Sequence, residues 1–174
     1  MDNAVTLPLR QLLARQPVAA LATLHQGAPA SSMVPFAWRP ASGELLLHVS
    51  RLATHTADML AQPAVSLLVQ GLPDMADTPL ALPRAAFSGQ ARPLAPGSEE
   101  AEAAQADYLA RLPDAAPLFN FGDFGLFAVQ VRSVRLVAGF GRAHSLTTAQ
   151  WQAVAATAPL GLGGNLATDL STGV

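Results

Sequence analysis

Six runs of strand length, separated by short turns, dominate this sequence and limit the folds that it can adopt. They cover residues 18–24, 30–38, 44–49, 64–70, 84–94 and 124–137. Residues 25–29 and 40–43 have the composition of tight turns, so the first three runs are typical of consecutive hairpins. Antiparallel strands joined in this way commonly close into small barrels. The sequence therefore predicts a mostly β fold, built on a six-stranded antiparallel barrel.

Helical patterns interrupt these runs and predict peripheral helices that pack outside the barrel. They cover residues 6–14, 54–61, 98–111 and 147–158. Thr54 can cap the second of these helices, and either Thr147 or Thr148 can cap the last. Glu100 and Glu102 follow Ser98 and give the third helix an acidic first turn, which favours the helix dipole. A chain of 174 residues is one ordinary domain by length. We expect this domain to span residues 1–158, followed by a mobile, glycine-rich tail over residues 159–174.

The composition argues against several classes of protein. Hydrophobic residues make up 51% of the chain and charged residues 13%, which excludes disorder over most of its length. No uncharged apolar run approaches the roughly 20 residues that cross a bilayer, so we expect no membrane span. Residues 1–10 lack the pattern of a secretory signal, and we therefore expect a cytoplasmic protein. A net charge of −2 argues against nucleic-acid binding.

Two absences restrict the chemistry further. The chain has no cysteine, and its four histidines lack the spacing of a metal site, so no metal is expected. All ten basic residues are arginine, a bias typical of a bacterial genome rich in G and C. Lysine-dependent sites such as P-loops are therefore excluded. Any bound anion must be held by arginine, histidine, hydroxyl or backbone N–H groups.

The segment from Ser50 to Thr56 concentrates such groups at the predicted start of a helix. It contains Ser50, Arg51, Thr54, His55 and Thr56 within seven residues. The first N–H groups of a helix have no partner within it and carry a partial positive charge. The segment can therefore cradle a phosphate. The alternative interpretation is a helix cap surrounded by solvated polar side chains.

Several segments together resemble the pyridoxamine 5′-phosphate oxidase-like FMN-binding split barrels, and most closely their heme-utilisation subgroup. These segments are residues 30–36, 47–50, 52–56, 82–84, 119–127 and 139–143. The resemblance covers roughly residues 12–150, in the same order along the chain. It implies a homodimer of split barrels, with one FMN in each of two clefts at the interface.

The resemblance also implies roles for individual residues. Ser32 and the backbone at Met33 and Val34 would meet the flavin ring. The ribityl phosphate would be held from segment 50–56, by Ser50, Arg51, Thr54, His55 and Thr56. The parent oxidase has basic residues where this chain has His55 and Thr56, as the heme-utilisation subgroup does. This departure argues against pyridoxamine phosphate as the substrate.

Three further residues are candidates for contact with the flavin or with the substrate. Arg84 begins a strand after two prolines, and it either faces the cleft or covers the strand end with its aliphatic stem. Arg142 and His144 follow two glycines on one strand face, and we predict that they act on the substrate side. An arginine can orient an anionic substrate, and an imidazole can exchange a proton near neutral pH. The alternative is an exposed strand end.

Three functions remain open from the sequence. The leading interpretation is an FMN-dependent oxidoreductase of the pyridoxamine 5′-phosphate oxidase-like class, acting on an unknown small molecule. The second is a heme-binding or heme-degrading utilisation protein, for which the expected C-terminal domain would have no room before Val174. The third is a non-catalytic FMN-binding protein. A bound flavin supplies the redox chemistry itself, so the residues alone do not separate these functions.

Overall fold

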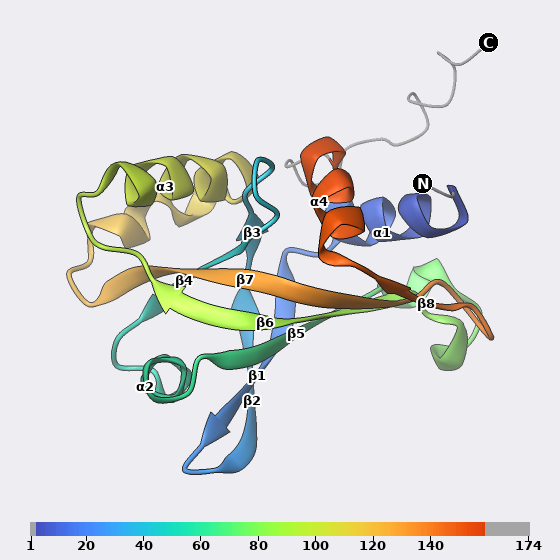
Figure 1. Cartoon of the computed structure of the whole chain (residues 1–174), viewed down its shortest axis with the longest axis horizontal. Coiled ribbons are helices and arrows are strands. Elements are labelled where there is room, and N and C mark those ends of the chain that lie inside the picture. The colour runs from blue at the N-terminus through green and yellow to red at the C-terminus, as the bar shows by residue number, and fades with distance from the viewer. Residues whose placement is uncertain (1–2, 159–174) are drawn as a thin grey trace.

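A computed structural model describes residues 3–158 of the chain, and the predicted tail at 159–174 lies outside the described residues. One antiparallel sheet curls into a half-barrel, and the helices lie around it (Figure 1). The strands are β1 (Val18–His25), β2 (Ala28–Pro35), β3 (Ala37–Trp38), β4 (Leu45–Ser50), β5 (Ala64–Gln70), β6 (Arg84–Pro93), β7 (Phe124–Val137) and β8 (Ala143–Leu146). The antiparallel, split-barrel-like arrangement confirms the predicted sheet.

The predicted number of six strands is wrong. Seven strands form one path in the order β2-β1-β5-β6-β7-β4-β3, and β8 pairs with β7. The run predicted at 30–38 divides at Phe36, whose N–H donates to the Pro17 carbonyl over 3.2 Å. Pro35 has no N–H to offer a neighbouring strand, which favours a break at this point. β8 follows a turn that contains Gly139 and Gly141, and it has only four residues. A strand this short does not produce a recognisable alternation in the sequence.

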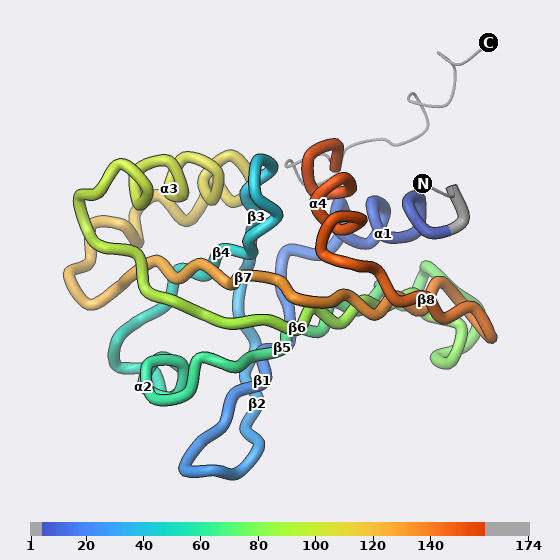
Figure 2. The backbone as a smooth tube through the Cα atoms, viewed as in Figure 1, coloured from blue at the N-terminus to red at the C-terminus, as the bar shows by residue number. Residues whose placement is uncertain are grey.

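The helices are α1 (Asn3–Arg15), α2 (Thr54–Ala61), α3 (Glu99–Arg111) and α4 (Thr148–Thr157), with short 3₁₀ segments η1 (Pro73–Met75), η2 (Pro79–Ala81) and η3 (Pro113–Asn120). Ser98 and Thr147 cap α3 and α4 through their hydroxyls, and of the two threonines that the sequence offers for α4 the cap is Thr147. Figure 2 shows α1 and α4 side by side. In the same view α3 lies on the other side of β3 from α4, and α2 lies near the β1–β2 hairpin. Within residues 3–158, no helix has the length and apolarity to cross a membrane.

Two hydrophobic cores lie on opposite faces of β4 and β7. The larger core fills the half-barrel and includes Leu21, Phe36 and Phe87, with Leu12 from α1 and Trp151 from α4. The smaller core lies between the sheet and α3; it consists of Ala37, Leu46, Leu94, Ala101, Ala104, Tyr108, Leu126 and Ala128, with Leu112, Ala115 and Phe119 packed against it. The second core exists because α3 and η3 cover a sheet face that would otherwise meet water.

Arg111, at the end of α3, bonds this helix to the end of α1 and to the β2–β3 break. Its side chain is 1% exposed, and it donates to the carbonyls of Phe36, Leu13 and Gln16. Its guanidinium lies 4.5 Å from the Trp38 ring centroid. Burial lowers the pKa of Arg111 to about 10. The arginine thus satisfies carbonyl groups at the end of α1 and at the β2–β3 break, which strand pairing leaves without partners.

Candidate functional site

The turn that precedes α2 is closed by its own hydrogen bonds. The Ser50 hydroxyl donates to Asp123 Oδ2 over 2.7 Å and accepts from the Leu52 N–H over 3.1 Å. The Arg51 N–H donates to the Asp123 carbonyl over 2.6 Å. Thr56 is buried, and its hydroxyl donates to the Ser50 carbonyl over 2.6 Å. The hydroxyl protons of Ser50 and Thr56 are therefore already used within the turn.

The first turn of α2 has no side-chain cap. Thr54 was predicted to be the N-cap, and this is wrong, because the N-cap is Ala53, which has no hydroxyl. The first N–H groups of α2 are therefore left without a capping side chain. Arg51 and Thr54 are exposed beside them. Of the side chains predicted to bind phosphate, these two have the exposure that an anion requires.

A cavity of 220 Å³ adjoins this turn. It is lined by Arg51, Thr56, Leu60, Pro93, Leu94, Pro96, Gly125, Leu126 and Phe127. Arg51 is the single charged residue in this lining. The cavity can accept an apolar group whose negative end lies near Arg51.

His55, the remaining residue of the segment, lies beside a buried carboxylate on α2. Its Nε2 is buried without a hydrogen-bond partner, and burial lowers the pKa of His55 while the Asp58 charge raises it. Asp58 accepts from the Thr23 hydroxyl over 2.9 Å and lies 2.8 Å from His25 Nδ1. These bonds, above all that from His25, hold the pKa of Asp58 below its usual value despite burial. The cluster fastens α2 to the β1–β2 hairpin.

The predicted flavin-contacting residues on β2 have mixed exposure. The Ser32 hydroxyl is buried without a partner, and the Val34 side chain is 2% exposed. Met33 faces the other way and is 68% exposed. A flat molecule on the outer face of the hairpin would therefore meet Met33 and the strand backbone.

The predicted substrate-side residues lie at the opposite end of the sheet from the α2 turn. Val137 pairs with both Arg84 and Ala143, whereas Phe124 pairs with Ser50. The 14 residues of β7 separate these ends by roughly 45 Å at about 3.3 Å per residue. Figure 1 shows β8 and α2 at opposite sides of the molecule. One copy of the chain therefore does not bring these ends together.

Arg84, Arg142 and His144 each have a different local environment. Arg84 donates to the carbonyls of Leu82, over 3.1 Å, and Leu80, over 3.4 Å, and so ties η2 to β6. Arg142 is exposed, and its guanidinium folds over Gly139, which has a φ of 131°. A Cβ at that glycine would lie 2.8 Å from Arg142 Nη2. His144 is half-buried on β8, opposite Leu136.

The outer face of the sheet carries exposed apolar side chains across β2, β1 and β5. Met33, Ala20 and Leu68 are directly opposite one another on these strands, and all three are exposed. The same row continues through Ala86 on β6 to Arg135 on β7. Within the described residues, Arg135 has no carboxylate partner and donates to Ser145 Oγ over 3.2 Å. This row is called the outer row below.

The comparison with family models gives the assignment of the chain. Residues 5–153 match the family described as "CREG, beta-barrel". The chain belongs to the CREG beta-barrel family. The fold agrees with the sequence-based resemblance to split barrels. The chain superposes on a protein of the pyridoxamine 5′-phosphate oxidase type from Listeria innocua with a TM-score of 0.56 and 14% identity, covering 78% of this chain and 99% of that one, a likeness that concerns the fold alone.

Relatives of this family member include proteins that are named for heme. The chain is 37% identical, over 119 residues, to the chloroplastic heme oxygenase HOZ of Arabidopsis thaliana; the match covers 68% of this chain and 35% of that protein. It superposes on the heme binding protein of Mycobacterium smegmatis with a TM-score of 0.75 and 29% identity, covering 88% of this chain and 61% of that one. The chain thus spans less than two thirds of each relative.

A flavin-binding neighbour shares the fold more distantly. The FAD-binding protein of Mesorhizobium loti superposes with a TM-score of 0.58 and 17% identity, covering 74% of this chain and 90% of that one. At this identity the likeness concerns the fold alone. The two relatives named for heme thus share 37% and 29% identity with this chain, whereas the similarity to the FAD-binding protein is structural.

Sequence reasoning missed several residues of these sites. Asp123 is the acceptor that holds Ser50, from a segment 73 residues further along the chain. Asp58 and Arg135 give no local signal, because their partners come from other elements of the fold. His48 lines a second cavity, which shares Leu94, Pro96, Gly125 and Leu126 with the cavity at the α2 turn.

Proposed function

We propose that this chain binds heme as its substrate or cargo. The observation that carries the proposal is the 37% identity to a heme oxygenase over 119 residues, joined by 29% identity to a heme binding protein over most of the chain. The sequence interpretation that placed FMN-dependent oxidation first therefore becomes the second candidate.

The outer row supports this proposal by its shape and charge. Heme is a flat apolar ring with two carboxylates on one edge. Met33, Ala20 and Leu68 form an exposed apolar row, and Arg135 lies on the same face without a carboxylate partner among the described residues. Charge-assisted bonds from a guanidinium to carboxylates are among the stronger polar contacts. We therefore place the heme ring over the apolar strands, with its carboxylates toward Arg135.

A second copy of the chain would complete such a site. Pockets that enclose a ligand of this size commonly measure roughly 300–1,000 Å³. The two cavities described here measure 220 and 170 Å³, and the outer row is open. We propose a homodimer in which the partner covers the heme and the exposed apolar row. The same arrangement can bring Arg142 and His144 of one copy toward the α2 turn of the other.

FMN is the second candidate, and the uncapped start of α2 favours it. Arg51, Thr54 and the first N–H groups of α2 would hold its phosphate, beside the 220 Å³ cavity. When bound, FMN would supply the redox chemistry. FMN fits this turn only in part. The hydroxyls of Ser50 and Thr56 already donate hydrogen bonds within the protein, and the Asp123 carboxylate lies beside the turn. Flavin contacts are proposed for five further residues under this candidate only, namely Ser32, Met33, Val34, His55 and Arg84.

A pair of arginine variants separates the two candidates. Arg135→Gln should weaken hemin binding at least about tenfold and leave FMN binding unchanged, since the lost bond is charge-assisted. Arg51→Gln should instead weaken FMN binding and leave hemin binding unchanged. The measurements are absorbance titrations of the full-length chain with hemin and with FMN. Equal effects of Arg135→Gln and Arg51→Gln on hemin would contradict the placement of heme on the outer row.

A further inference from the structure

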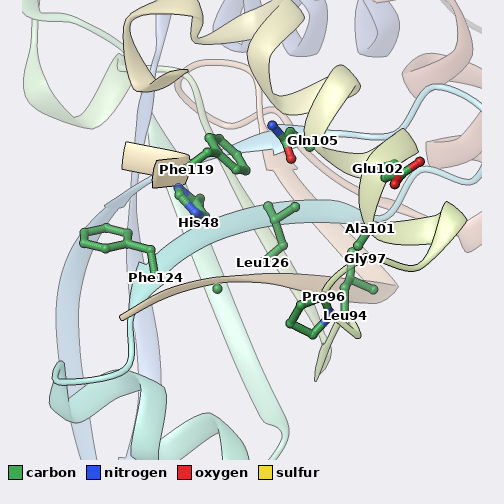
Figure 3. A pocket seen from close by; sticks show the side chains of 11 residues that line it. His48, Leu94, Pro96, Gly97, Ala101, Glu102, Gln105, Phe119, Phe124 and Leu126 are labelled. Atoms are coloured by element: carbon green, nitrogen blue, oxygen red, sulfur yellow. The ribbon is translucent and has the colours of Figure 1, made fainter. Parts of the chain in front are cut away.

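His48 lies on β4 at the open end of the smaller core, among aromatic rings. Its imidazole is stacked on Phe119, with ring centroids 3.8 Å apart and an interplanar angle of 4°. Phe124 lies 5.2 Å away and Tyr108 5.9 Å away, both at steep angles. Figure 3 shows His48 and Phe119 together at one side of a pocket, with Leu126 between them and α3. The stack fixes the plane of the imidazole.

One nitrogen of this imidazole is buried without a partner in the fold. His48 is 6% exposed, its Nδ1 is buried without a hydrogen bond, and no side-chain bond to Nδ1 forms within residues 3–158. Burial lowers the pKa of His48 to about 4, so the ring is neutral at pH 7 and has one donor and one acceptor nitrogen. Buried polar groups are nearly always paired, so the unpaired Nδ1 calls for an explanation.

The cavity beside His48 measures 170 Å³. It is lined by His48, Leu94, Pro96, Gly97, Ala101, Glu102, Gln105, Phe119, Phe124, Gly125 and Leu126. An engineered apolar cavity of about 150 Å³ holds a benzene molecule. The space therefore suits one six-membered ring.

The lining also selects the charge of an occupant. Glu102 is its single charged residue, and no arginine reaches it, so an anion would meet repulsion and no counter-charge. The walls are otherwise apolar or aromatic, apart from Gln105 and the imidazole. A hydroxyl can donate to one imidazole nitrogen or accept from the other, so it pairs with either tautomer.

We propose that this cavity binds an uncharged phenol-type ring, whose hydroxyl hydrogen-bonds the His48 imidazole. The ring would pack on Leu94, Leu126 and Phe124, and its edge would meet the His48–Phe119 stack. This site lies on the face of β4 and β7 that α3 covers, and it is independent of the heme proposal because no group of the outer row lines it.

Titration of the full-length chain with phenol and with benzene tests the proposal. We expect phenol to shift the ¹⁵N resonances of the His48 ring and to saturate with a Kd of about 1 mM or tighter. His48→Phe keeps an aromatic ring for the stack and removes both nitrogens. It should weaken phenol binding at least about tenfold and leave benzene binding equal or tighter. Leu80→Phe, which adds an aromatic ring at an exposed position on η2, is the control and should change neither affinity.

If His48→Phe does not fold, the Ala101→Leu variant and the ring resonances of the wild-type chain still test whether phenol binds in this cavity. Ala101→Leu fills the cavity from α3 and should abolish phenol binding, while the ring resonances of the wild-type chain report the hydrogen bond directly. Phenol that fails to saturate by about 20 mM would mean that the cavity holds water only, and would overturn the proposal. Equal phenol affinity in the wild type and in His48→Phe would overturn it as well.

Discussion

The Ser50 hydroxyl donates to Asp123 Oδ2 over 2.7 Å, and this bond places a carboxylate beside the start of α2. The helix start attracts anions, and the carboxylate repels them. The turn can therefore be stable without a bound phosphate, because the hydroxyls of Ser50 and Thr56 and the N–H groups of Arg51 and Leu52 are paired within the protein.

Replacing Asp123 with Asn should tighten FMN binding about fivefold. The change removes one negative charge near the proposed phosphate and keeps an oxygen that accepts from Ser50; a gain of about 1 kcal/mol is reasonable for partly screened charges. FMN fluorescence quenching measures the effect, with Asp114→Asn on η3 as the control. Weaker FMN binding in the Asp123 variant would show that the carboxylate supports the site.

His48 should make the protein sensitive to mild acid. Burial lowers its pKa from 6.5 to about 4, so the unfolded chain binds this proton first as the pH falls. The stability from a neutral His48 is complete above pH 6.5 and is lost between there and pH 4. We expect this residue to account for about 2–3 kcal/mol of that loss, at about 1.4 kcal/mol per pKa unit.

Urea unfolding at pH 7 and pH 4.5 measures that loss. The His48→Phe variant should lose less stability than the wild type by the same amount, since the other titrating groups are common to both proteins. Identical losses in the two proteins would contradict the assignment of a neutral, buried imidazole.

The bond between Thr23 and Asp58 should contribute to stability, because it joins the β1–β2 hairpin to α2. Both side chains are buried, and the acceptor is charged. Thr23→Val removes the donor at nearly constant volume and should lower the free energy of unfolding by about 1.5–3 kcal/mol. Thr78→Val, at an exposed position without a side-chain cap bond, should change it by less than about 0.5 kcal/mol. Similar losses in both would rule out a special role for the Asp58 cluster.

The outer row predicts the assembly state. Leu68 is 39% exposed in the middle of this row, where a lysine would place an unpaired charge in the proposed dimer interface. Light scattering at micromolar concentration should report two chain masses for the wild type and about one for Leu68→Lys. Leu80→Lys, at a 67% exposed leucine on η2, should remain a dimer. A wild-type mass of one chain would contradict the proposed homodimer.

Local patterns in the sequence predicted much of the fold. The bounds of α2, β5 and β7 agree with the expected ranges, because alternation, helix periodicity and flanking prolines are local signals. Gly89 was expected at a bulge, and the β6–β7 register does shift there; a Cβ at that position would lie 2.2 Å from the Gln130 carbonyl oxygen. Close backbone approach explains the glycine.

The features that sequence reasoning missed depend on contacts between distant segments. Arg111 bonds Phe36 across 75 residues, and His25 meets Asp58 across 33 residues. Phe36 and Trp38 are completely buried, which assigns them to the core. The residues of the phosphate-binding hypothesis were named from a local motif, whereas the bonds that occupy Ser50 and Thr56 required the fold.

The most direct test of the account is a pair of titrations on one preparation of the purified full-length chain, freed of bound ligand. Hemin should produce a saturable Soret band with one heme per chain, and it should bind at least about 100-fold more tightly than FMN, a difference of about 2.7 kcal/mol. Hemin absorbance that rises without saturation, together with FMN binding at a lower Kd, would contradict the proposal that this CREG beta-barrel protein binds heme.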